Sequence, residues 1–121
     1  MKNKGALGAW GEAVAADFLR KKRYRIVAMN YHCRYGEIDI IAQNKVYLAF
    51  VEVKMRASST FAEAREFVDP HKQQRLLTSA KLWLSENETD LQPRFDVIEI
   101  YAPEGADTKK PIISHIEDAF S

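Results

Sequence analysis

The sequence predicts a single α/β domain with a mixed central β-sheet flanked by helices. The chain has 121 residues, of which 46% are hydrophobic, and this suffices for one core without disulfides. Apolar residues recur at helical spacing in some segments and alternate at strand spacing in others. The predicted order is one helix, three strands, one or two helices and two strands, which suits one layered α/β domain.

An amphipathic helix is predicted over residues 6–23. The apolar side chains of its main stripe follow helical spacing: Leu7, Trp10, Val14 and Phe18. Glu12 lies nearly opposite Trp10 on a helical wheel, within a second stripe of small and apolar residues. We expect another surface to pack on this stripe with Glu12 pointing into it, although an isolated helix glutamate is usually solvated.

Three strands follow, one over residues 24–31 and two in a hairpin over 37–55. Side chains alternate across a strand, so one face of the hairpin is apolar. We expect this face to be the core, formed by Ile38, Ile40, Ala49, Val51 and Val53.

The loop of this hairpin sets its register. We expect a two-residue loop, Asn44-Lys45, because Asn tolerates the positive φ of a type I′ turn. In this register Asp39 lies opposite Phe50 and diagonal to Glu52 on the same face. A three-residue loop would place Asp39 and Glu52 on opposite faces.

The second half of the chain predicts helices and then strands. Residues 61–68 indicate a short helix, and Asp69 caps a longer one with Pro70 at its first position. The buried stripe of the longer helix is predicted to comprise Leu76, Leu77, Ala80, Trp83 and Leu84. Strands over 94–101 and 112–116 complete the sheet.

Composition excludes several classes of protein. The single cysteine, Cys33, excludes an intrachain disulfide and a zinc site built on cysteines. With no apolar run of about 18 residues and no signal-peptide core, we expect a cytoplasmic protein without membrane contact. The net charge of +1 hides a division, because residues 1–60 hold 11 Lys and Arg against 5 Asp and Glu.

Two charges interrupt the strand segment FVEVK, residues 50–54. Glu52 and Lys54 share a face, and the predicted register adds Asp39 to it. Two carboxylates with open water positions suit Mg²⁺ or Mn²⁺ that also binds a phosphate. Lys54 would then orient water or stabilise charge on phosphorus, and Glu12 would complete the site. Taken alone, FVEVK also fits a half-exposed strand with a surface ion pair.

Cations in the chain are candidates for contacts with nucleic-acid phosphates. The candidates are Lys22, Arg23, Arg25, Arg34, Arg56 and Lys72. The basic run at 20–25 also fits a solvated helix end, where cations suit the helix dipole. Lys72 lies in the first turn of a predicted helix, an end that attracts anions, and solvation is its alternative.

The pattern of Asp39 followed by Glu52-Val53-Lys54 resembles the PD-(D/E)xK nuclease signature. Longer strings are more specific: GxxGE at 8–12, GEIDII at 36–41, FVEVKMR at 50–56 and RFDVIEI at 94–100. Together they resemble the YraN-like family of small bacterial proteins over nearly the whole chain. This resemblance implies a restriction-endonuclease-like core and one nuclease-like domain over residues 1–121.

The helix glutamate followed by Asp and Glu-x-Lys is also similar to archaeal Holliday-junction resolvases. That similarity implies a metal surrounded by the carboxylates of Glu12, Asp39 and Glu52 and the carbonyl of Val53. It implies that Lys54 acts on the attacking water. Ile38 departs from the proline of the signature, and KKRY at 21–24 replaces a glycine before the first strand; the second departure affects loop shape and leaves the acids intact.

These observations favour a Mg²⁺-dependent endonuclease, or a nuclease-like nucleic-acid-binding protein, acting on DNA in branched or single-stranded form. The alternative is a non-catalytic DNA-binding or protein-interaction module on the same fold, with Glu12 and Asp39 paired to Arg34 or Arg56. A homodimer is a further expectation, since resolvase-like nucleases that cut both strands usually dimerise. Asp96 is expected to pair with Arg94 or a neighbouring strand and has no catalytic role.

Overall fold

The computed structural model describes residues 5–57 and 69–120 and forms a five-stranded mixed sheet between two helices. Its elements are α1 (Ala6–Lys21), β1 (Arg25–Cys33), β2 (Gly36–Gln43), β3 (Tyr47–Arg56), α2 (Pro70–Glu86), β4 (Gln92–Tyr101), the 3₁₀ turn η2 (Gly105–Asp107) and β5 (Ile112–Ile116). The strands lie in the order β1-β2-β3-β4-β5, with β3 and β4 parallel and the other neighbours antiparallel. The predicted α/β fold is confirmed and is consistent with a restriction-endonuclease-like core; the expected helix over 61–68 lies outside the described residues.

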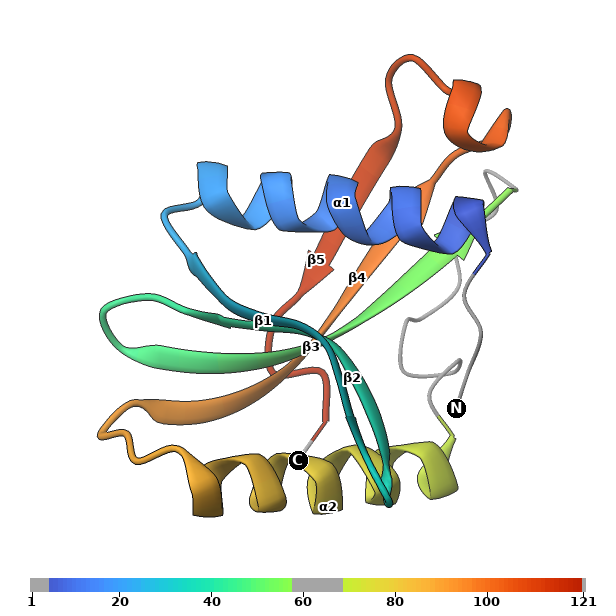
Figure 1. The fold of residues 1–121 in the computed structure, drawn as a ribbon. Coiled ribbons are helices and arrows are strands. Elements are labelled where there is room, and N and C mark those ends of the chain that lie inside the picture. Colours follow the sequence, from blue (N-terminus) through green and yellow to red (C-terminus); the bar gives the residue numbers. More distant parts are fainter. Residues whose placement is uncertain (1–4, 58–68, 121) are drawn as a thin grey trace.

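The first helix covers one face of the sheet and the second helix covers the other (Figure 1). The deeply buried positions of α1 are those of the small stripe: Gly11, Glu12, Ala15, Ala16 and Leu19. Gly11 permits this close packing, since a Cβ built on it would lie 2.3 Å from Sδ of Met55 on β3. Leu7, predicted to belong to the apolar stripe, is 45% exposed. Packing on the small stripe brings the helix axis close to the sheet and turns Leu7 outward.

The second helix follows its predicted capping and burial. Asp69 accepts a hydrogen bond from the backbone N–H of Lys72 at 2.8 Å, and Pro70 is the first helical residue. Leu76 and Trp83 of α2 are buried in one cluster with Phe50 of β3. No helix within residues 5–57 and 69–120 is long and apolar enough to cross a membrane.

The predicted register of the β2–β3 hairpin is wrong by two residues. Gln43 pairs with Leu48, and residues 44–46 lie between the two strands. The side chain of Asn44 accepts hydrogen bonds from the N–H groups of Val46 and Tyr47, at 2.9 and 2.7 Å. This Asx-type turn replaces the tight type I′ turn. Because the shift is an even number of residues, the side chains of the paired residues 40–43 and 48–51 keep their predicted faces.

The predicted core face of the hairpin is wrong at one position. Ile40 and Val51 belong to the cluster beneath α1, but Ile38 belongs to the cluster beneath α2. Regular β2–β3 pairing runs only as far as Ile40 and Val51. Beyond that pair the Asp39 carboxylate accepts the N–H of Val53, at 2.8 Å. A side chain thus replaces a ladder contact, and the alternation of β2 breaks there.

Candidate functional site

Two buried carboxylates meet where β2 leaves β3. Asp39 and Glu52 are 4% and 5% exposed. Burial raises the pKa of Glu52, and the nearby charge of Asp39 raises it further, while Lys72 and Lys54 act in the opposite direction. Asp39 and Lys54 therefore both lie close enough to Glu52 to act on its charge. Two acids that repel each other in a buried place create a local preference for a cation.

Lys72 of α2 supplies one such cation from within the chain. Its Nζ lies 2.9 Å from Oε1 of Glu52, and its side chain is 25% exposed. Burial lowers the pKa of Lys72, but the charge and hydrogen bond of Glu52 outweigh burial and raise it. The sequence assigned Lys72 to phosphate contacts. In this structure its ammonium is held by Glu52.

Glu12 approaches the sheet from a different direction. It is 4% exposed and lies on α1, the helix that covers the Val51 face, whereas Glu52 faces α2. Within the described residues, no group of three or more His, Cys, Asp or Glu side chains is placed to hold a metal ion together. The ligands that suit a divalent cation here are therefore the carboxylates of Asp39 and Glu52, with water and phosphate as the remaining ligands.

A pocket of about 740 Å³ opens beside Glu52. Its walls are the β1–β2 turn with adjoining residues, 32–37, and the α2 residues Lys72, Arg75 and Leu76. The turn contains Gly36 at φ +145°, a conformation that favours glycine. Of the six candidate nucleic-acid contacts, Arg34 and Lys72 line this pocket.

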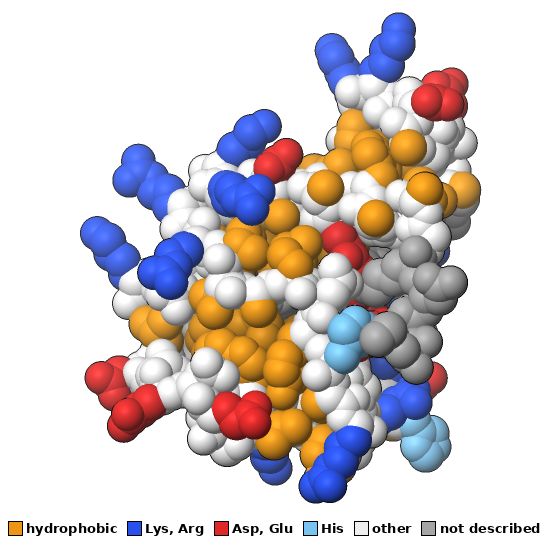
Figure 2. Space-filling model, viewed as in Figure 1, with side chains coloured by type: hydrophobic (Ala, Val, Ile, Leu, Met, Phe, Trp, Pro, Cys, Tyr) orange, Lys and Arg blue, Asp and Glu red, His pale blue; other side chains and the backbone are white. Residues whose placement is uncertain are grey.

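The remaining candidate cations lie elsewhere. Arg23 and Arg25 are exposed where α1 ends and β1 begins, the end of the molecule from which Lys and Arg side chains project in Figure 2. Arg56 forms an ion pair with Glu99 at 2.8 Å. The basic run therefore does not contribute to the pocket.

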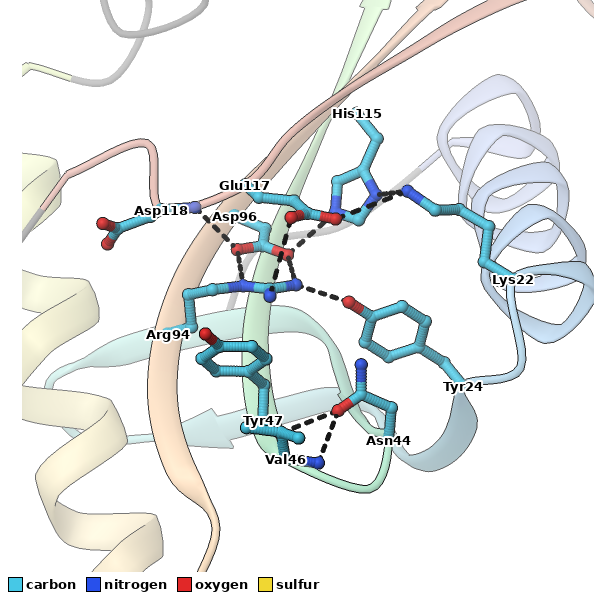
Figure 3. Close-up of polar contacts among 10 residues, drawn as sticks. All are labelled: Lys22, Tyr24, Asn44, Val46, Tyr47, Arg94, Asp96, His115, Glu117 and Asp118. Carbon is cyan, nitrogen blue, oxygen red and sulfur yellow. Dashed lines mark hydrogen bonds and ion pairs between the residues drawn. The ribbon is translucent and has the colours of Figure 1, made fainter.

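A second buried polar cluster lies between β4, β5 and the end of α1 (Figure 3). Arg94 donates two hydrogen bonds to the fully buried carboxylate of Asp96, at 2.9 and 2.8 Å. His115 Nε2 lies 2.8 Å from the same carboxylate, and its Nδ1 lies 2.7 Å from Nζ of Lys22. Because an ammonium only donates, Nδ1 accepts and the Nε2–H donates to Asp96.

This cluster confirms the predicted pairing of Asp96 with Arg94. It also explains the position of Lys22, which lies 3.6 Å from Glu117 and is oriented toward the tail after β5. The cluster joins α1, β4 and the tail, and none of its residues lines the pocket. We interpret it as structural.

Two charged residues of the pocket were not predicted from the sequence. Arg75 lies one turn after Lys72 on α2, and Glu37 is the second residue of the GEIDII string and lies 3.2 Å from His32. The helical spacing from Lys72 to Arg75 is a signal that was present. The meeting of α2 with the β1–β2 turn depends on the tertiary fold, which the spacing alone does not reveal.

Comparison with known proteins places the chain among bacterial relatives. The model of "Uncharacterised protein family UPF0102" matches residues 11–100. A UPF0102 protein of Caldanaerobacter subterraneus subsp. tengcongensis is 45% identical over 120 residues, covering 98% of this chain and 97% of the relative. UPF0102 proteins of Nocardia farcinica and Acetivibrio thermocellus are 44% and 43% identical, covering 98% of this chain and 91% and 93% of the relatives. The YraN-like resemblance is thereby confirmed, and the chain belongs to family UPF0102.

Proposed function

We propose that the protein is a divalent-metal-dependent endonuclease acting on DNA through Asp39, Glu52 and Lys54. The observation that carries the proposal is the buried pair of carboxylates, Asp39 and Glu52, beside a pocket whose lining includes Arg34, Lys72 and Arg75. Buried like charges are costly, and such an arrangement is common at sites that bind a cation or perform acid–base chemistry. The resemblance of Asp39 and Glu52-Val53-Lys54 to the nuclease signature favours the first of these.

Each residue has a role in this proposal. Asp39 and Glu52 would hold Mg²⁺ or Mn²⁺, and the chemistry supplied by such an ion is activation of water and stabilisation of charge on phosphorus. The hydrogen bond from the Val53 N–H fixes the Asp39 carboxylate in place. Lys54 would donate to the attacking water or to a phosphate oxygen.

Glu12 and the carbonyl of Val53 remain candidate ligands through the resemblance alone. Glu12 lies on the helix over the opposite face of β3, so we rank it below Asp39 and Glu52.

The proposal is tested by metal binding and cleavage with the wild-type chain. Mg²⁺ and Mn²⁺ are titrated calorimetrically, and single-stranded, flapped, branched and duplex DNA are incubated with and without EDTA. We expect heat of binding for at least one metal, and cleavage that EDTA abolishes. The proposal would be overturned if no metal bound at millimolar concentration and no substrate were cleaved.

Replacing Lys72 by methionine is expected to tighten Mn²⁺ binding about tenfold. The ion no longer has to displace an ammonium that forms a charged hydrogen bond with Glu52. Calorimetric titration of the K72M variant measures this change, and K81M, on the exposed side of α2, is the matched control. Unchanged or weaker Mn²⁺ binding in K72M would show that Lys72 does not compete for the position of the metal.

The second candidate is a non-catalytic nucleic-acid-binding or protein-interaction module. The contact between Lys72 and Glu52 favours it, since this ion pair compensates one buried acid without any bound ion. Arg56, which this candidate expects to pair with Glu12 or Asp39, forms an ion pair with Glu99 at 2.8 Å instead. The same titration separates the two candidates, because a module of this kind needs no divalent metal.

A further inference from the structure

We propose that the pocket between α2 and the β1–β2 turn binds an unpaired nucleotide of a single-stranded nucleic acid, with Arg34 and Arg75 holding its phosphates. This inference rests on the proposed function, because it assigns a substrate class to the same site.

The shape of the pocket favours a single strand over a duplex. Its volume of about 740 Å³ falls within the range of about 300–1,000 Å³ for clefts that enclose small ligands. Glu52, one of its lining residues, is only 5% exposed. A base in a duplex is stacked on both faces and paired at its edge, so a duplex reaches only the rim. An unpaired nucleotide can turn out of its strand and enter.

The charges of the pocket suit phosphate. Arg34 and Arg75 are exposed at its two walls, one on the turn and the other on α2. Their guanidinium groups provide planar forks that match phosphate oxygens. Lys72 is held by Glu52, so we assign the phosphate contacts to the two arginines.

Arg34 is also ordered before any ligand arrives. Its guanidinium carbon lies 4.9 Å from the ring centroid of Tyr35, and it donates to the Tyr35 hydroxyl at 2.7 Å. Holding a long side chain in one position lowers the entropy lost on binding. A guanidinium plane is also a surface on which an unpaired base stacks.

The basic run at the end of α1 provides a natural control. Arg25 pairs with Gln43 at one end of the β1–β2 hairpin, and the Cys33–Gly36 pair marks the other end, where the pocket lies. Arg23 and Arg25 are exposed, so removing them deletes the same charge as removing Arg34 and Arg75. A site at the pocket and a diffuse basic surface therefore predict different results.

The test is fluorescence anisotropy in EDTA, so that neither metal nor cleavage contributes. The probes are an oligothymidylate of about 12 nucleotides, within the site sizes of single-strand-binding proteins, and a duplex of the same length. We expect the single strand to bind about tenfold more tightly than the duplex. The R34A/R75A variant should weaken single-strand binding about tenfold and reduce the salt slope by about 1.4, for two lost phosphate contacts. The R23A/R25A variant should change it less than about twofold.

Three results would overturn the inference: equal weakening by both variant pairs, duplex binding as tight as single-strand binding, or equally effective competition by an oligoglutamate of the same charge. The last would indicate an acidic protein partner. Failure here is distinguishable from failure of the proposed function. If the protein binds metal and cleaves DNA but does not prefer single strands, only this inference fails. If it binds the single strand in EDTA but cleaves nothing when metal is present, only the proposed nuclease activity fails.

Discussion

Replacing Asp96 by asparagine is expected to lower the free energy of unfolding by about 3–5 kcal/mol, the usual cost of removing one partner of a buried ion pair. The Asp96 carboxylate is fully buried and accepts hydrogen bonds from Arg94, His115 and the backbone N–H of Asp118. Asparagine keeps the shape but removes the charge that compensates the buried guanidinium. Urea unfolding followed by circular dichroism measures the loss.

The effect should depend on pH in a defined direction. Burial raises the pKa of Asp96, but hydrogen bonds from His115 and Arg94 outweigh burial and hold it below its usual value. A carboxyl with a depressed folded-state pKa contributes stability that is complete above the unfolded value of about 3.9 and is lost as pH falls through the folded value. The advantage of the wild type over D96N should therefore shrink as the pH is lowered below about 4.

The matched control for this measurement is D17N. Asp17 pairs with Arg20 on the surface of α1, with both side chains more than half exposed, and such pairs contribute about 0–1 kcal/mol. A loss below about 1 kcal/mol in D96N, similar to D17N, would mean that the buried cluster adds no stability beyond a surface ion pair.

Replacing Asp39 by asparagine is expected to reduce metal-dependent cleavage at least about a hundredfold, because the charge stabilisation supplied by a bound metal is several kcal/mol and each 1.36 kcal/mol is a factor of ten. The asparagine oxygen can still accept the N–H of Val53, which Asp39 now accepts at 2.8 Å. The fold should therefore persist while the negative charge is lost. Single-turnover cleavage and calorimetric titration of Mn²⁺ measure the two consequences.

The exposed D17N variant again serves as control, since it deletes one carboxylate that is not part of the pocket lining. Thermal unfolding of D39N separates a chemical effect from loss of structure. Cleavage by D39N at the wild-type rate, with unchanged Mn²⁺ affinity, would remove Asp39 from the proposed site and leave the non-catalytic module as the better interpretation.

Local patterns were sufficient to predict most of the fold. Period and capping predicted α2, because Asp69 and Pro70 act within one helical turn. The hairpin register was predicted incorrectly because the side chain of Asn44 bonds to Val46 and Tyr47 and widens the loop. The prediction of a type I′ turn took no account of these competing hydrogen bonds to the Asn44 side chain.

The candidate site was only partly predictable. The same-face placement of Glu52 and Lys54 follows from strand alternation and needs no tertiary information. The contact of Lys72 with Glu52, and the pocket that α2 forms with the β1–β2 turn, join segments distant in sequence. Such contacts arise from packing of the whole domain. The hydrophobic periodicity of a single segment does not predict these long-range contacts.

The central position of β3 has a consequence for the dynamics of the site. This strand pairs with β2 on one side and, over its whole length, with β4 on the other. Amide hydrogens in such a doubly bonded strand exchange with solvent only through sub-global or global opening. Residues 48–51, which pair on both sides, are therefore expected to exchange slowly, and they are followed directly by Glu52 and Val53, which are held by β4 and by the bond from the Val53 N–H to Asp39. A ligand that reaches them meets a rigid floor, and any motion needed for its entry belongs to the surrounding helix and turn.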